Sequence, residues 1–298
     1  ARVGVVLPYL ATRPGGARTA VQPTLLAAQL RYASPFAVGA SLFSMRMQSD
    51  QWIAASMLPG AAFAAFTIGA VVLPVASLIR QPINSAMLPK LSLEFAAGRH
   101  ARVHRLLVNG SSAATLILVP VAGILFVLAP EIVSLIYTEQ YAAAVPVMRV
   151  YLVLIIMQAF AIGYAMPILN LGRLAMRINA LGLVLSVLTS LAGAWCFGLP
   201  GAALGSVLAF AVSEVVNMRV IAKTVGKSFF DMFPLRLSVI TVASAGSGLL
   251  VSLLVDAAPG DGVWMAAALK LGLYGSIVLG VFIVAGGFKE VRRVRSSA

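Results

Sequence analysis

The sequence predicts an all-α bundle of about eight transmembrane helices, and three observations carry this prediction. Of the 298 residues, 60% are hydrophobic and only 10% are charged, and the mean hydropathy is +0.98. A soluble domain has roughly 45–50% apolar and about 25% charged residues, so this chain lacks the polar surface that water requires. Apolar stretches of about 20 residues recur along the chain, which is the length that crosses a bilayer as a helix. Because backbone polar groups in lipid must be satisfied internally, we expect every crossing to be helical.

Six segments are long and apolar enough to span a bilayer: 106–128, 146–169, 178–197, 201–221, 237–254 and 263–285. Upstream, residues 34–88 are also apolar, but polar residues interrupt them between 44 and 51. Two helices, at about 34–55 and 61–88, fit this stretch. The alternative, a loop followed by one long helix, leaves residues 34–43 too short to span.

The basic residues orient these spans. Lysine and arginine gather in alternate connections, at 90–105, 173–177, 223–236 and 289–295. None of the three intervening connections contains a lysine or arginine, and two of them, at 129–145 and 255–262, carry acidic residues. Cytoplasmic loops are the ones enriched in lysine and arginine, so the C-terminus is predicted to be cytoplasmic. Residues 1–31 are then expected to form a cytoplasmic connector or interfacial segment, and residues 289–298 a basic cytoplasmic tail.

Several classes of function are excluded or disfavoured by composition. The net charge of +13 comes without basic clusters interleaved with aromatic residues, so we expect no nucleic-acid partner. The single cysteine, Cys196, excludes an intrachain disulfide and a cysteine metal site. No catalytic triad, phosphate-binding loop or metal signature is present, so we expect no catalytic residues, no metal and no cofactor, and a protein that is not an enzyme. His100 and His104 are interpreted as part of a basic patch beside the membrane.

Charged residues inside the first predicted helix are the first candidates for a site. Arg46 and Asp50 lie four residues apart, hence on one helix face, and can pair with each other. Two hypotheses follow: a neutralised packing pair, or a direct role in handling a substrate or an ion. Gln48 and Gln51 make a second face polar, so this helix should line an aqueous cavity or a bundle core.

The second helix carries Arg80 beside Gln81 and Asn84, deep in its apolar stretch and without an acidic residue one turn away. An unpaired guanidinium beside amides is typical of an anion site, because its planar fork matches phosphate oxygens. The alternative is an ion pair between Arg80 and Asp50 across the two helices. Either way, residues 32–170 are expected to provide about four spans that line a central cavity, and residues 171–288 about four more.

Three further charged residues fall within later spans. Glu214 is deep enough to be a protonatable site, or to pair with a neighbouring base. Arg149 and Lys270 lie near the predicted outer ends of their helices, and their long stems are expected to reach the interface.

Four short motifs resemble a known family. They are LRYASPF at 30–36, QSDQWIA at 48–54, NSAMLPKLS at 84–92 and VSLIYTEQY at 133–141. Together they are similar to oligosaccharide flippases of the multidrug/oligosaccharidyl-lipid/polysaccharide exporter superfamily. The last motif departs from that family, which usually carries Phe-Gly where Tyr137 and Thr138 stand.

The resemblance implies the second lobe of a fourteen-helix, two-lobe transporter in the bacterial cytoplasmic (inner) membrane. A first lobe of about six helices would then be absent from this chain, and we expect it as a partner together with membrane lipids. The implied function is flipping of undecaprenyl-pyrophosphate-linked oligosaccharide by alternating access, for surface polysaccharide biosynthesis. Its predicted substrate-binding residues are Arg46, Arg80, Gln48, Gln51, Gln81 and Asn84, with Asp50 and Glu214 for ion coupling or charge pairing.

Three alternatives stay open. A peptidoglycan-precursor flippase would carry the same pyrophosphate, and a cation-coupled drug exporter belongs to the same superfamily. A non-transporting membrane subunit of a polysaccharide-assembly complex is the alternative of another class.

Overall fold

The computed structural model describes residues 23–254, 263–284 and 286–287, and every regular element in these ranges is helical. In chain order the elements are α2 (Pro23–Met57), α3 (Gly60–Gly69), η1 (Ala70–Val72), α4 (Leu73–Ala96), α5 (His100–Val127), α6 (Ala129–Tyr137), η2 (Glu139–Tyr141), α7 (Ala144–Ala159), η3 (Gly163–Ala165), α8 (Gly172–Thr224), η4 (Phe230–Met232), α9 (Leu235–Leu254) and α10 (Val263–Val284). The prediction of an all-α membrane bundle is confirmed.

Four helical stretches are long and apolar enough to cross a membrane by length and composition: Gly60–Ala96, His100–Val127, Gly172–Thr224 and Ala267–Val284. The other predicted spans overlap α2, α7, α9 and the second half of α8. Helix α2 starts at Pro23, so residues 23–31 of the expected connector form its first turns. Residues 1–22 and the expected basic tail at 289–298 lie outside the described residues.

Helix α8 supplies two of the predicted spans because its chain reverses at Gly198. This glycine has φ 64° and ψ −139°, a conformation that favours glycine, and it separates two helical halves. The halves run antiparallel in close contact, since Gly201 lies against Gly193, and the Thr189 hydroxyl donates to the Gly205 carbonyl at 2.8 Å. Small residues at such an interface let the backbones of two membrane helices approach closely.

Helices α3 and α4 form one bent rod through the 3₁₀ turn η1. Pro74 has no N–H to donate to Ala70 four residues earlier, so the α-helical ladder is interrupted there, and Leu73 donates to Ala70 instead. Proline in the first turn of a helix is tolerated because that position has no intrahelical partner in any case.

The prediction of one continuous span over 146–169 is wrong. Helix α7 ends at Ala159, and only the short turn η3 follows before α8 begins at Gly172. Pro167 is a physical reason why the helix does not continue to residue 169, since in a continuous helix its ring would clash with the carbonyl of Gly163, and it has no N–H to donate to that carbonyl. Non-helical backbone at membrane depth is tolerated only inside protein or beside a water-filled cavity, which directs attention to this segment.

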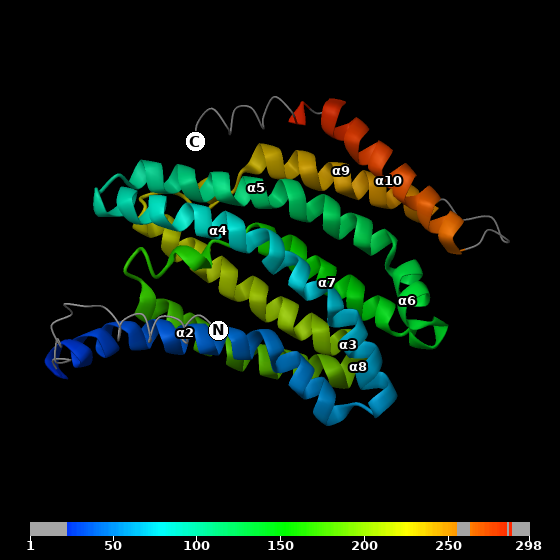
Figure 1. The fold of residues 1–298 in the computed structure, drawn as a ribbon, viewed down its shortest axis with the longest axis horizontal. Helices are drawn as coiled ribbons and strands as arrows, with labels where there is room; N and C mark the ends of the chain where they lie inside the picture. The colour runs from blue at the N-terminus through cyan, green and yellow to red at the C-terminus, as the bar shows by residue number, and fades with distance from the viewer. Residues whose placement is uncertain (1–22, 255–262, 285, 288–298) are drawn as a thin grey trace, which may run out of the picture.

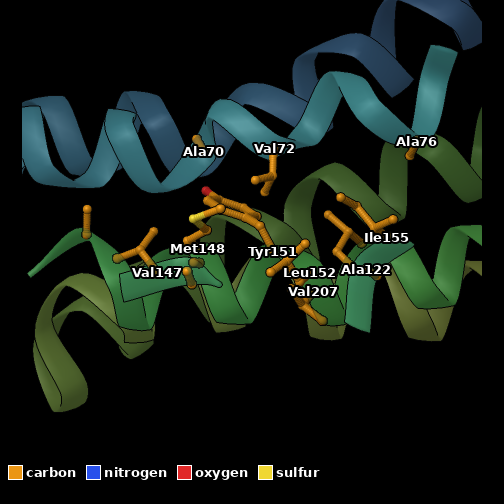
Figure 2. Close-up of a cluster of buried hydrophobic side chains, with 14 of the residues drawn as sticks. Ala70, Val72, Ala76, Ala122, Val147, Met148, Tyr151, Leu152, Ile155 and Val207 are labelled. Atoms are coloured by element: carbon orange, nitrogen blue, oxygen red, sulfur yellow. The ribbon is translucent and has the colours of Figure 1, made fainter. Parts of the chain in front are cut away.

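Helix α7 lies at the centre of the bundle (Figure 1). Its buried face, from Val147 to Ile155, packs between η1 and α4 on one side and α5 and α8 on the other (Figure 2). On one flank α8 packs against α2, and on the other α5 packs against α9, which in turn contacts α10. The cavity described below lies between α2, α4, α7 and α8, away from α9 and α10.

Large apolar side chains are exposed on the outside of this bundle. Leu181, Leu188 and Trp195 on α8 are 59–79% exposed, and Leu269 on α10 is 57% exposed. Contiguous exposed apolar surface of this kind is rare on soluble monomers and is what a lipid solvent requires.

Thr138, which follows α6, has φ 77° and ψ 159°. This region is essentially restricted to glycine and costs another residue about 1–3 kcal/mol, and a β-branched side chain fits it especially poorly. Thr138→Gly should therefore raise the free energy of unfolding of the detergent-solubilised protein by about 1 kcal/mol after the entropy cost of glycine, which is measured as a higher thermal unfolding midpoint. Thr138→Ala keeps the Cβ and should give no such gain; a lower midpoint for Thr138→Gly would contradict the prediction.

Candidate functional site: a polar cavity inside the bundle

A cavity of about 930 Å³ opens between α2, α4, α8 and the break after α7. All eight site residues predicted from the sequence line it: Arg46, Gln48, Asp50 and Gln51 from α2, Arg80, Gln81 and Asn84 from α4, and Glu214 from α8. The wall therefore includes α8, which belongs to the second group of spans, so the expected division at residue 170 does not separate the cavity helices from the others. The part these residues play in binding stays a prediction.

The hypothesis of an Arg46–Asp50 pair is wrong, because the Asp50 carboxylate is held by other groups. Tyr151 and Ser206 each donate a hydroxyl to its Oδ2 at 2.7 Å, and the backbone N–H of Gln51 donates to Oδ1 at 2.8 Å. Asp50 is only 1% exposed, so a buried carboxylate is satisfied by hydrogen bonds from three groups rather than by a cation.

Arg46 extends instead toward α8. An added Cβ at Gly182 would lie 2.7 Å from Nη1 of Arg46, so the glycine makes room for the guanidinium. The guanidinium carbon lies 5.1 Å from the centre of the Phe43 ring and 5.7 Å from that of Phe210. Cations are attracted to the faces of aromatic rings, which partly offsets the cost of desolvation.

The guanidinium of Arg46 nevertheless has unused donors. The side chain is 2% exposed, forms no ion pair within the described part of the chain, and its Nε and Nη1 have no hydrogen-bond partner. Glu214 acts on it through its charge without a direct contact. Buried charged donors without an acceptor are costly, so this arrangement suits a site that receives an anion.

The guanidinium of Arg80 already has hydrogen-bond partners in the main chain. This differs from both hypotheses, an unpaired guanidinium and an ion pair with Asp50. Its Nη1 donates to the carbonyl of Ala159 at 3.1 Å, its Nη2 donates to the carbonyl of Ala161, and its guanidinium lies 5.5 Å from the Tyr164 ring. The last carbonyls of a helix have no intrahelical donor and carry partial negative charge. Arg80 therefore caps the end of α7.

Glu214 binds main-chain N–H groups of the same break after α7. Its Oε1 accepts the backbone N–H groups of Ile162 at 2.6 Å and Gly163 at 2.9 Å, and its Oε2 accepts from Asn217 at 3.1 Å. Gly163 permits this approach, because an added Cβ there would lie 2.6 Å from Nδ2 of Asn217. Glu214 is thus neither partnered by a base nor free, and it satisfies main-chain donors that the break leaves open.

The amide side chains of the cavity have donors or acceptors that form no strong hydrogen bond within the protein. Oδ1 of Asn84 is buried without a hydrogen-bond partner, and Gln48 forms only a long bond of 3.4 Å to the carbonyl of Ser44. Sequence reasoning missed the cavity residues Tyr151, Tyr164 and Ser206, which are single polar residues in apolar helices and carry no pattern of their own.

Other charged candidates lie outside the cavity. Lys270 forms an ion pair with Glu131 of α6, and the expectation that its stem reaches the outer interface stays a prediction. Arg149 stacks on Phe126, with its guanidinium carbon 5.1 Å from the ring centre. The His104 ring contacts the backbone carbonyl of Asp231 at 2.8 Å, and no cluster of three metal-binding side chains occurs among the described residues.

Two comparisons relate this sequence to known proteins. Residues 13–146 match the family described as polysaccharide biosynthesis protein. A stretch of 157 residues, 52% of the chain, is 23% identical to the probable low-salt glycan biosynthesis flippase Agl15 of Haloferax volcanii. The chain is thus similar, over about half of its length, to proteins of polysaccharide and glycan biosynthesis, and the relative is described as a probable flippase. The matched stretch is 33% of that relative, so the chain spans about a third of the length of the curated relative it matches.

The printed name of that relative describes a flippase, and the long apolar helices of this chain fit a multi-pass membrane protein. The family match covers α2, where Arg46 and Asp50 lie, and α4, where Arg80 lies. Ser206 and Glu214 on α8 come after the residues that match the family, and the structure adds them to the cavity wall.

Proposed function

We propose that this chain forms one lobe of a transporter that flips undecaprenyl-pyrophosphate-linked oligosaccharide for surface polysaccharide biosynthesis. The proposal places it in the bacterial cytoplasmic membrane with a cytoplasmic C-terminus, and gives it an upstream lobe of about six helices as a partner across the cavity. Alternating access moves the headgroup between leaflets without a chemical step. The observation that carries the proposal is Arg46, a buried cation with unused donors on the cavity wall.

A pyrophosphate needs hydrogen-bond donors and positive charge inside the bilayer. Nε and Nη1 of Arg46 supply unused donors, and a guanidinium binds phosphate oxygens in a bidentate geometry. Arg80 contributes positive charge to the same cavity, but its donors already serve the carbonyls of Ala159 and Ala161. Arg46 is therefore the primary phosphate-binding residue in this proposal, and Arg80 the secondary one.

The remaining cavity side chains suit the sugar and the coupling step. Gln48, Gln51, Gln81 and Asn84 offer amide donors and acceptors that match sugar hydroxyls. Asp50 is the proposed ion-coupling residue, since hydroxyl groups hold its carboxylate and no cation pairs with it in the described ranges. Glu214 balances the charge of Arg46 and Arg80 from across the cavity.

Arg46→Gln in the full-length protein tests this proposal. The variant loses the charge that binds pyrophosphate, so surface polysaccharide output in a strain that depends on the protein should fall by about 10-fold or more, since a charge-assisted hydrogen bond is worth about 1.5–3 kcal/mol. Arg149→Gln is the matched control, because Arg149 is also an arginine stacked on a phenylalanine but lies outside the cavity. Undiminished output from an Arg46→Gln protein that reaches the membrane would refute the assignment.

A peptidoglycan-precursor flippase is the second candidate, because the same Arg46 site would bind the pyrophosphate that both lipids carry. Competition between the two lipids for the purified full-length protein separates the candidates. Binding that depends on Arg46 for the peptidoglycan precursor but not for the other lipid would favour the second candidate.

A further inference from the structure

A second pocket, of about 470 Å³, lies where α4 and α5 meet beside their connection, away from the central cavity. Its lining residues are Lys90, Leu93 and Glu94 from α4, and Arg102, Arg105, Leu106 and Asn109 from α5. The connection between these helices is one of the basic loops expected on the cytoplasmic side (Figure 1). The transport proposal above makes no use of this pocket.

The charge of the pocket is strongly positive. Glu94 is its acidic residue, and it is neutralised by Arg99, whose Nε donates to Oε2 at 2.6 Å, with Arg102 at 3.5 Å from Oε1. Lys90 and Arg105 have no carboxylate partner among the described residues. Three basic side chains therefore line the pocket against one acid that is already paired.

An unused donor lies in the same pocket. Nδ2 of Asn109 is buried and has no hydrogen-bond partner. A buried donor of this kind requires an acceptor, and beside arginine and lysine the matching acceptor is a phosphate oxygen. The pocket thus combines positive charge with a donor that no protein group satisfies.

The pocket also has an apolar side. Leu93 is 69% exposed, and Leu106 also lines the pocket. Exposed leucine next to basic residues at the end of two membrane helices fits a ligand that joins an anionic headgroup to an acyl chain, since basic pockets between membrane helices bind such headgroups. We propose that this pocket binds the phosphodiester headgroup of an acidic phospholipid.

Thermal unfolding of the detergent-solubilised full-length protein, titrated with lipid, tests the site. Dioleoylphosphatidylglycerol should raise the midpoint saturably, and dioleoylphosphatidylcholine, whose phosphate is balanced by choline, should not. The Lys90→Gln/Arg105→Gln double variant should weaken binding of dioleoylphosphatidylglycerol about 30-fold in apparent Kd, since each basic contact near a membrane surface contributes about 5-fold in affinity. Asn109→Asp, which replaces the donor with a negative charge, should weaken it as well.

The matched control is the Arg173→Gln/Arg177→Gln double variant. It removes the same charge from exposed residues at the start of α8, on the same expected side of the membrane, and should bind as the unmodified protein does. Equal weakening in both double variants would overturn the proposal, because binding would then follow net charge alone. Absence of stabilisation by the acidic lipid would overturn it too, as would inorganic phosphate stabilising the protein equally well. None of these measurements depends on transport.

Discussion

Replacing Gly205 by alanine is expected to abolish packing between the two halves of α8. An added Cβ would lie closer than 3.0 Å to the backbone nitrogen and Cα of Ser190 and to the carbonyl carbon of Thr189. These are main-chain atoms of a helix, so no rotamer change relieves the overlap, and the hydrogen bond from Thr189 to the Gly205 carbonyl would also be displaced. Overpacking of a tight core costs typically about 1–3 kcal/mol and more when backbone must move. We expect little folded protein when the detergent-solubilised variant is analysed by size-exclusion chromatography and thermal unfolding.

Gly272→Ala is the control for this experiment. Gly272 lies within α10, where an added Cβ meets no atom within 4 Å, so the substitution should leave stability equal or raise it by up to about 1 kcal/mol through helix propensity. A Gly205→Ala protein that unfolds at the same temperature as Gly272→Ala would show that the α8 hairpin is not closely packed.

The second large effect is expected for Glu214→Leu. Leucine cannot accept the backbone N–H groups of Ile162 and Gly163, so the break after α7 loses the acceptor that satisfies both. Hydrogen bonds to a charged group contribute about 1.5–3 kcal/mol each, which corresponds to roughly 10- to 100-fold faster exchange of these two amides. Hydrogen–deuterium exchange of peptides that contain residues 160–166 measures this directly, and polysaccharide output should fall in parallel.

Two companion variants separate geometry from charge. Glu214→Gln keeps an acceptor oxygen and should restore most of the amide protection while it removes the negative charge. Glu139→Leu removes an exposed carboxylate far from the break and should change neither measurement. If the amides of Ile162 and Gly163 stayed protected in Glu214→Leu, the role assigned to this side chain would have to be abandoned.

Sequence reasoning located the cavity wall well on α2 and α4, for a physical reason. Ionisable and amide side chains are expensive in lipid, so Arg46, Asp50, Arg80 and Asn84 had to face protein or water, and helical spacing assigned them to faces. The reversal at Gly198 was equally readable, since glycine and proline between two apolar stretches mark a turn. Both inferences need only local chemistry.

Partners within the cavity were beyond the same reasoning. The i, i+4 spacing of Arg46 and Asp50 permits a pair, but it contains no information on Tyr151 and Ser206, which are about 100 and 156 residues further along and satisfy the carboxylate instead. The role of Arg80 depends on where α7 ends. Hydropathy alone describes residues 146–169 as one apolar stretch, so the main-chain carbonyls that Arg80 binds were not visible as acceptors.

The break after α7 also ties backbone solvation to the width of the cavity. Arg80 on α4 and Glu214 on α8 hold carbonyl and amide groups of one short stretch, residues 159–163, from two different helices. If α4 and α8 moved apart, at least one of these side chains would leave its main-chain partner. The main-chain groups would then lack a hydrogen-bond partner until water reached them. A widening of the chamber is thereby coupled to its hydration, a link that four uninterrupted helices around the same space would not have.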